Sequence, residues 1–88
     1  MSDIKKVGVI GCGLMGRGIA QVSAASGYET VVREVNDDLL QSGLAAIGKQ
    51  LNRAVEKGKL EAADCEATLG RLSGTVALED LADCDIII

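Results

Sequence analysis

Val7-Gly8-Val9-Ile10-Gly11-Cys12-Gly13-Leu14-Met15-Gly16 is the stretch of this sequence that decides its fold. Its β-branched residues lead directly into three glycines with the spacing GxGxxG, and a helical pattern follows. A second apolar segment then ends on an acid at Glu34. A strand, a glycine-rich turn, a helix and an acid near the end of the next strand together form the dinucleotide-binding fingerprint of parallel α/β folds.

Each glycine of this turn has a different physical role. Gly11 allows a sharp turn off the strand, Gly13 lacks the Cβ that would hold a pyrophosphate away, and Gly16 lets the helix lie close to the sheet. The free backbone N–H groups of Leu14 and Met15 point at the phosphates, where the helix dipole adds roughly half a positive charge. The sequence therefore predicts a pyrophosphate site at these five residues, with a Rossmann-type turn for another ligand, or for none, as the alternative.

Glu34 indicates which dinucleotide this site would prefer. It lies 21 residues after Gly13, close to the spacing of about 20 at which the second strand reaches the adenosine ribose. Its carboxylate would accept hydrogen bonds from the ribose hydroxyls and repel a 2′-phosphate, which favours NAD over NADP. Arg33 leaves this preference partly open, because a guanidinium beside the ribose could stack on adenine or pair with a phosphate.

Composition excludes several classes of function. The chain has 88 residues, enough for one small domain, with 48% hydrophobic residues, a net charge of −4 and a pI near 4.6. That charge argues against nucleic acid or an anionic membrane as the main partner, and no apolar run approaches the length of a membrane span. Three cysteines without a CxxC pair and the absence of histidine argue against a metal site and a disulfide scaffold, and favour a reducing, cytoplasmic compartment.

The cysteines themselves have two interpretations. Cys12 lies inside the glycine turn, where a reactive thiolate at a helix N-terminus is conceivable, but the simpler interpretation is that this position needs a small residue. Cys65 and Cys84 are expected to be small core residues.

Apolar periodicity predicts an α/β fold, with a Rossmann-type parallel sheet and a long helical hairpin over about residues 36–72, between the second and third strands. Asn36 is a suitable N-cap for the first hairpin helix, and Gly27 and Gly58 are suitable residues to end helices. Strands are expected at about 5–10, 29–35, 75–78 and 85–88, and helices at about 14–26, 36–57 and 60–72. The turn before the third strand is predicted at Ser73-Gly74.

The last residues, Asp85-Ile86-Ile87-Ile88, have the pattern of a fourth, central parallel strand. The sheet predicted from residues 1–88 is therefore incomplete. We expect the chain to be the N-terminal part of a longer dinucleotide-binding domain; the alternative is a complete small protein that finds its missing strands in an oligomer.

A basic ridge lies on the predicted helix 36–57, opposite its apolar stripe. Lys49, Arg53 and Lys57 follow one another at intervals of four residues, so they share one helix face. Taken alone, such a ridge is typical of a solvated surface.

Three runs of the sequence resemble the L-3-hydroxyacyl-CoA dehydrogenase family, and within it the bacterial 3-hydroxybutyryl-CoA dehydrogenases. They are VGVIGCGLMGRGIAQVSAASGYETVVREV, RAVEKGKL at residues 53–60, and LSGTVALEDLADCDIII. The similarity extends over the whole chain, and the VEKGKL turn is more specific to the family than the glycine motif. Members oxidise a 3-hydroxyacyl-CoA to a 3-ketoacyl-CoA with NAD, or catalyse the reverse reaction.

This resemblance implies roles for particular residues. Gly11, Gly13, Leu14, Met15 and Gly16 match the pyrophosphate turn, and Glu34 matches an acid that is usually Asp in relatives. Arg53 and Lys57 match basic positions that face the CoA moiety, which makes a CoA contact as credible as a solvated surface. The resemblance also implies an acyl-CoA substrate, and a homodimer formed by the full-length protein.

No catalytic residue is identified within residues 1–88. The family's catalytic His and Glu, with the Ser and Asn that assist them, come later in the chain, and this sequence contains no histidine. The 88-residue chain is therefore expected to bind NAD without turnover. Two alternatives remain: a non-catalytic NAD-binding module, and a related NAD-dependent hydroxyacid dehydrogenase, which would need no cations at Arg53 and Lys57.

Overall fold

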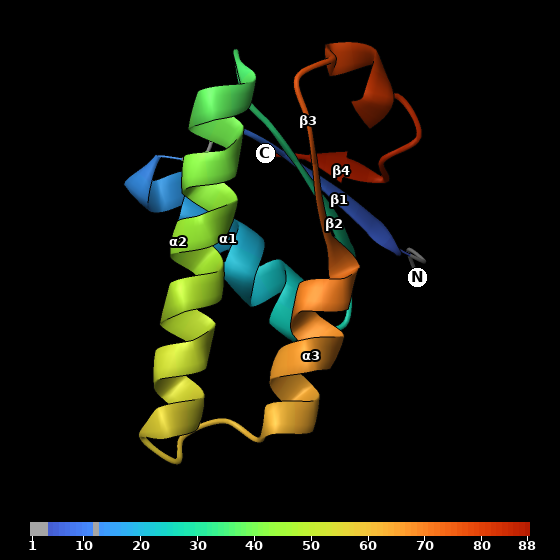
Figure 1. Ribbon diagram of the computed structural model, residues 1–88. Helices are drawn as coiled ribbons and strands as arrows, with labels where there is room; N and C mark the ends of the chain where they lie inside the picture. Colours follow the sequence, from blue (N-terminus) through green and yellow to red (C-terminus); the bar gives the residue numbers. More distant parts are fainter. Residues whose placement is uncertain (1–3, 12) are drawn as a thin grey trace.

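The structure is a computed structural model that describes residues 4–11 and 13–88. It contains a four-stranded parallel sheet in the order β3-β2-β1-β4, with three α-helices and one short 3₁₀ helix, η1 (Figure 1). In chain order the elements are β1 (Lys6–Ile10), α1 (Leu14–Ala25), β2 (Glu29–Arg33), α2 (Asp37–Glu56), α3 (Ala62–Arg71), β3 (Leu72–Thr75), η1 (Leu78–Leu81) and β4 (Ile86–Ile87). The predicted Rossmann-type sheet with a helical hairpin between β2 and β3 is confirmed.

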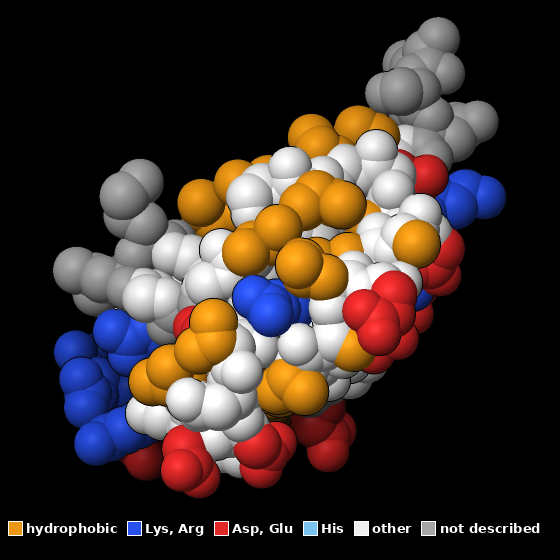
Figure 2. Space-filling view, turned by 90° about the horizontal axis from the view of Figure 1, so that it is seen from above, with side chains coloured by type: hydrophobic (Ala, Val, Ile, Leu, Met, Phe, Trp, Pro, Cys, Tyr) orange, Lys and Arg blue, Asp and Glu red, His pale blue; other side chains and the backbone are white. Residues whose placement is uncertain are grey.

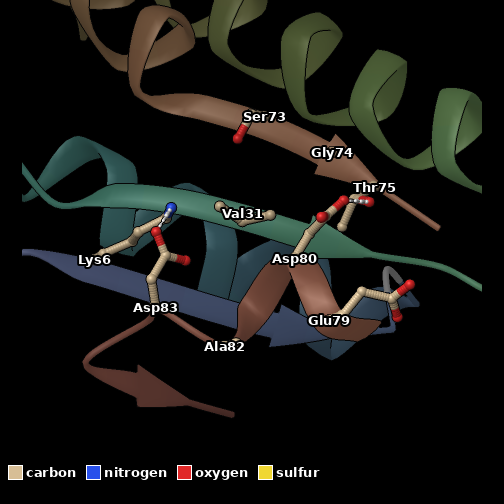
Figure 3. Close-up of a pocket in the computed structure, with 9 residues that line it drawn as sticks. All are labelled: Lys6, Val31, Ser73, Gly74, Thr75, Glu79, Asp80, Ala82 and Asp83. Carbon is tan, nitrogen blue, oxygen red and sulfur yellow. Dashed lines mark hydrogen bonds and ion pairs between the residues drawn. The ribbon is translucent and has the colours of Figure 1, made fainter. Parts of the chain in front are cut away.

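The direction of the crossovers decides which face of the sheet the helices cover. The chain passes from β1 to β2 through α1, and from β2 to β3 through α2 and α3, moving each time toward the same edge. The return from β3 to β4 runs the other way, so a right-handed crossover places η1 on the opposite face. Figure 3 shows η1 on one side of the strands and the turns of α1 on the other.

The core lies between the sheet and the helices. Val9 and Val32 are paired on neighbouring strands and are almost completely buried, as is Ile47 of α2 at 1% exposure. Leu40 and Leu51 of the same helix, and Cys65 of α3, complete the buried cluster. The apolar stripe predicted for α2 therefore packs on the sheet, and Cys65 is the small core residue that the sequence indicated.

The helix ends follow local chemistry. The side-chain oxygen of Asn36 accepts a hydrogen bond from the backbone N–H of Leu39 at 2.8 Å, which confirms the predicted N-cap. Gly27 and Gly58 follow the C-caps of α1 and α2 with φ angles of +100° and +71°, in the left-handed region that glycine tolerates best.

The third strand was misplaced by the sequence prediction. It begins at Leu72, directly after α3, so Ser73-Gly74 lies within the strand and is not a turn. Gly74 leaves room there for α2, which passes close over it: a Cβ on this residue would lie 2.6 Å from Cδ1 of Leu40, so that side chain would have to shift. The glycine serves helix-to-sheet packing, which a local pattern does not distinguish from a turn.

The buried residues of α3 are Cys65 and Thr68. Thr68 is buried, whereas Leu69 is exposed, as is Ala62 at the start of the helix. The hydroxyl of Thr68 donates to the carbonyl of Asp64 at 2.8 Å, so its polar group is satisfied inside the helix. Backbone hydrogen bonding thus makes a threonine acceptable on the buried face of this helix.

Asp85 fixes the position of β4 beside β1. Its carboxylate accepts hydrogen bonds from the backbone N–H groups of Lys5 and Lys6, at 2.8 and 3.0 Å, and its own N–H donates to the carbonyl of Lys6 at 2.9 Å. The two backbone donors lower the pKa of Asp85 below its ordinary value of 3.8.

This lowered pKa gives a pH-dependent prediction. Because the folded-state pKa lies below the unfolded one, Asp85 contributes stability above pH 3.8 that is lost as the pH falls through the folded pKa. We expect Asp85→Asn to lower the free energy of unfolding at neutral pH, with the difference from wild type closing at acidic pH. Urea unfolding across the acid range would measure this, and a difference that stays constant with pH would contradict it.

Candidate dinucleotide site

The turn after β1 is shaped by Gly11. Its φ angle is +90°, which side-chain-bearing residues rarely adopt, and its N–H donates to the carbonyl of Arg33 at 2.8 Å. The glycine turn is therefore attached to the end of β2, and the two carboxyl strand ends lie side by side. Ligands of open α/β sheets bind at this edge.

Gly13 is the N-cap of α1 and leaves open space above the helix. A Cβ on Gly13 would meet no described heavy atom within 4 Å. Its carbonyl accepts the N–H of Arg17 at 2.9 Å, but the first N–H groups of α1, those of Leu14 and Met15 among them, have no partner within the helix. The first turn of α1 carries no acidic residue to occupy these donors. The helix end is thus suited to an anion.

Gly16 holds α1 against the turn. A Cβ at this position would lie 2.0 Å from the carbonyl oxygen of Gly11, which is a direct overlap of atoms. The backbone of α1 consequently approaches the turn more closely than any other residue type would allow. Cys12, the remaining residue of interest in this segment, lies outside the described residues, so its two interpretations stay open.

Glu34 follows β2 at the same edge of the sheet. Its N–H donates to the carbonyl of Thr75 at 3.0 Å, and its carboxylate accepts the N–H of Val35 at 3.2 Å. These bonds hold the residue at the carboxyl ends of β2 and β3, beside the glycine turn. Arg33 lies at the same edge, where its Nε donates to the carbonyl of Val76 at 3.2 Å.

The basic ridge lies on the side of α2 and is exposed to solvent. Lys49 and Arg53 line one groove together with neutral residues and Glu56, while Lys57 is the C-cap at the turn of the hairpin and lies outside that groove. Lys49 and Arg53 thus share a groove that Lys57 does not line.

Comparison with known proteins decides the family. The family model for the NAD-binding domain of 3-hydroxyacyl-CoA dehydrogenase matches residues 6–88. The chain belongs to this family. Its cofactor is therefore NAD, and the resemblance inferred from the sequence is confirmed.

Individual relatives agree with this assignment. The chain is 48% identical, over 94% of its length, to a probable 3-hydroxybutyryl-CoA dehydrogenase of Deinococcus radiodurans, and 46% identical, over 97%, to a 3-hydroxybutyryl-CoA dehydrogenase of Bradyrhizobium diazoefficiens. The crystal structure of Mycobacterium tuberculosis FadB2 superposes with a TM-score of 0.94 at 42% identity, over 98% of this chain. The chain spans only about 30% of the length of each of these proteins.

An apolar surface at the cofactor edge of this NAD-binding domain was not predicted from the sequence. Figure 2, seen from above, faces the carboxyl ends of β2 and β3 and shows hydrophobic side chains gathered there. Ile10 ends β1, Val35 and Val76 follow β2 and β3, and the three residues are 48%, 66% and 44% exposed. Such residues are suited to contact with the faces of an adenine ring. Periodicity assigns apolar residues to the core, so only their exposure in the structure identifies them.

A groove on the other face of the sheet is a poor candidate site. Lys6, Val31, Asp80 and Asp83 are among the residues that line it, between the strands and η1 (Figure 3). Two pairs of its polar groups are already joined: Lys6 with Asp83 at 2.8 Å, and the hydroxyl of Thr75 with Asp80. The groove also lies on the sheet face, away from the strand ends where ligands of this fold bind.

Within residues 4–11 and 13–88 the structure contains no cluster of His, Cys, Asp and Glu that could hold a metal ion. In the same residues, no helix has the length and apolar character needed to cross a membrane.

Proposed function

We propose that this chain is the cofactor-binding part of an oxidoreductase that interconverts a 3-hydroxyacyl-CoA and a 3-ketoacyl-CoA, using NAD as the hydride carrier. The observation that carries the proposal is the family match over residues 6–88. The glycine turn supports it, because the free N–H groups of the helix face open space at Gly13. The relatives named above favour 3-hydroxybutyryl-CoA as the substrate. We further propose that the full-length protein is a homodimer, as the family resemblance implies, and that it lies in the cytoplasm, as the cysteine pattern favours.

The catalytic residues of this proposed enzyme lie outside residues 1–88. A general base must reach the substrate hydroxyl, and this sequence has no histidine and no other residue suited to that role. Bound NAD would accept the hydride from the substrate carbon. The residues of this chain hold that cofactor in position at the edge of the sheet.

The mass of the polypeptide made from the natural gene tests whether cofactor binding and catalysis depend on different parts of the chain. A mass far above 9.1 kDa, together with oxidation of 3-hydroxybutyryl-CoA by the full-length protein and none by residues 1–88, is the expected result. A mass near 9.1 kDa would instead support a non-catalytic NAD-binding module. Turnover by residues 1–88 alone would overturn the proposed absence of catalytic residues.

Within this proposal, Glu34 selects NAD over NADP. Its carboxylate lies at the carboxyl end of β2, where it would bind the adenosine ribose and repel a 2′-phosphate. Glu34→Ala is expected to weaken NADH binding about tenfold, since a charge-assisted hydrogen bond is lost, and to narrow the preference over NADPH. Titration with both cofactors measures this.

A matched control is available on the same strand. Glu29 is exposed at the amino end of β2, away from the glycine turn, so Glu29→Ala removes the same charge and should leave the preference unchanged. Equal affinities of the wild-type protein for NADH and NADPH would refute the role of Glu34.

Arg53 and Lys57 contribute cations to the CoA side of the proposed site. Their charges are exposed, so we expect the double variant Arg53→Ala and Lys57→Ala to raise the KM for the CoA substrate by about tenfold at low salt, and by less at high salt. Steady-state kinetics of the full-length protein measures this. The charge-preserving pair Arg53→Lys and Lys57→Arg should retain most of the affinity. An unchanged KM in the alanine variant would favour a substrate without CoA.

A further inference from the structure

Two adjoining grooves run from the start of α1 across to α2. The first is lined by Arg17, Gly18, Gln21, Val22, Ala46 and Gln50, and the second by Ala46, Lys49, Gln50 and Arg53. Ala46 and Gln50 line both grooves, so the two adjoin along α2, and together we call them the α1–α2 groove. It leads from the first turn of α1, next to the glycine turn, to the basic ridge of α2.

The α1–α2 groove is lined by cations and contains no acid. Arg17, Lys49 and Arg53 contribute three positive charges, and its other lining residues are neutral. None of the three forms a salt bridge with another described residue. Figure 2 shows Lys and Arg side chains gathered on the side where Figure 1 places α2 and the start of α1. In a chain of net charge −4 this grouping indicates an anionic ligand.

Arg17 has a second feature that points to a ligand. Its Nε is buried, yet within residues 4–11 and 13–88 it has no hydrogen-bond partner. Buried donors are almost always paired in folded proteins, so an unpaired one requires an explanation. Arg17 also lies in the first turn of α1, where the helix dipole disfavours a cation. An anion in the groove would supply the missing acceptor and offset this repulsion.

The shape of the α1–α2 groove distinguishes between two possible anions. The pyrophosphate of NAD would lie on the N–H groups of α1, above Gly13, whereas Arg17 lines a groove that leads away from this point toward Arg53. A cation at each end of the groove fits a long ligand with separated phosphates. Coenzyme A has this form, with a diphosphate and a 3′-phosphate on one nucleotide.

We propose that Arg17 is an additional substrate-binding residue, which contacts a phosphate of the acyl-CoA in the α1–α2 groove, with Lys49 and Arg53 on the other wall. This inference rests on the proposed function, because it assumes a CoA substrate. It adds a residue of α1 to a site otherwise assigned to α2 alone.

The test is ligand binding by the full-length protein. In Arg17→Met the aliphatic stem is kept and the charge is lost, so the Kd for CoA should rise about tenfold while the Kd for NADH stays unchanged. Arg17→Lys keeps the charge and should recover much of the affinity. Lys5→Ala removes one exposed cation at the amino end of β1, far from the groove, and should leave CoA binding unchanged.

Each outcome separates this inference from the proposed function. Failure of the wild-type protein to bind CoA overturns both. CoA binding that is weakened by Arg53→Ala and Lys57→Ala but not by Arg17→Met overturns the role of Arg17 alone. Weaker binding of NADH to Arg17→Met, with CoA unaffected, would assign Arg17 to the cofactor instead. Thermal unfolding checks that each variant folds. If Arg17→Met does not fold, Arg17→Lys is measured in its place. A Kd for CoA of Arg17→Lys that equals the wild-type value at low salt as well as at high salt would then overturn the proposal.

Discussion

Replacing Gly16 by alanine is expected to destabilise the domain by about 3–5 kcal/mol and to abolish NADH binding. The new Cβ would lie 2.0 Å from the carbonyl oxygen of Gly11 and 3.0 Å from its carbon. Both partners are backbone atoms, so no side-chain rotation relieves the overlap, and α1 must move away from the turn. Ala20 and Ala24 of this helix are completely buried, so such a movement also disturbs the core. Urea unfolding and NADH titration measure the two effects.

Gly18 provides the control for this prediction. It lies two residues further along α1, and a Cβ there would meet no described heavy atom within 4 Å. Gly18→Ala should therefore stabilise the helix by about 0.5–1 kcal/mol, because alanine loses less backbone entropy than glycine. A Gly16→Ala protein with wild-type stability and wild-type NADH affinity would refute the proposed role of the close contact.

Much of the fold is predictable because its determinants are local. The cap at Asn36 and the left-handed glycines at positions 27 and 58 depend only on neighbouring residues. The start of β3 was not predictable in the same way. Gly74 gives room to Leu40, which lies 34 residues earlier in the chain, and sequence periodicity contains no information about such a distant contact.

In the candidate site, too, residues set by local sequence are predictable and residues set by distant contacts are not. The glycine turn and Glu34 have a fixed spacing that follows from the length of one helix and one strand, so they are found from the sequence. Arg17 has no such signal, because its importance depends on where α2 crosses α1. Periodicity assigns Lys49 and Arg53 to one helix face, but only the packed structure shows that this face adjoins Arg17.

A substitution at Gly13 should separate cofactor binding from folding. Gly13 adopts φ −71° and ψ −171°, which any residue tolerates, and its missing Cβ faces open space. Gly13→Val is therefore expected to change the free energy of unfolding by no more than about 1 kcal/mol, as for other N-cap replacements.

NADH binding should respond very differently to Gly13→Val. The valine side chain would fill the space through which the pyrophosphate approaches the N–H groups of α1, and two charge-assisted hydrogen bonds would be lost. At about 1.5–3 kcal/mol each, this loss corresponds to an affinity more than about a hundredfold lower. Fluorescence titration with NADH, on protein shown by urea unfolding to be folded, measures it. Unchanged NADH affinity in the folded variant would place the pyrophosphate elsewhere, whereas loss of binding with stability retained would show that the space above Gly13 is needed for the cofactor and not for the fold.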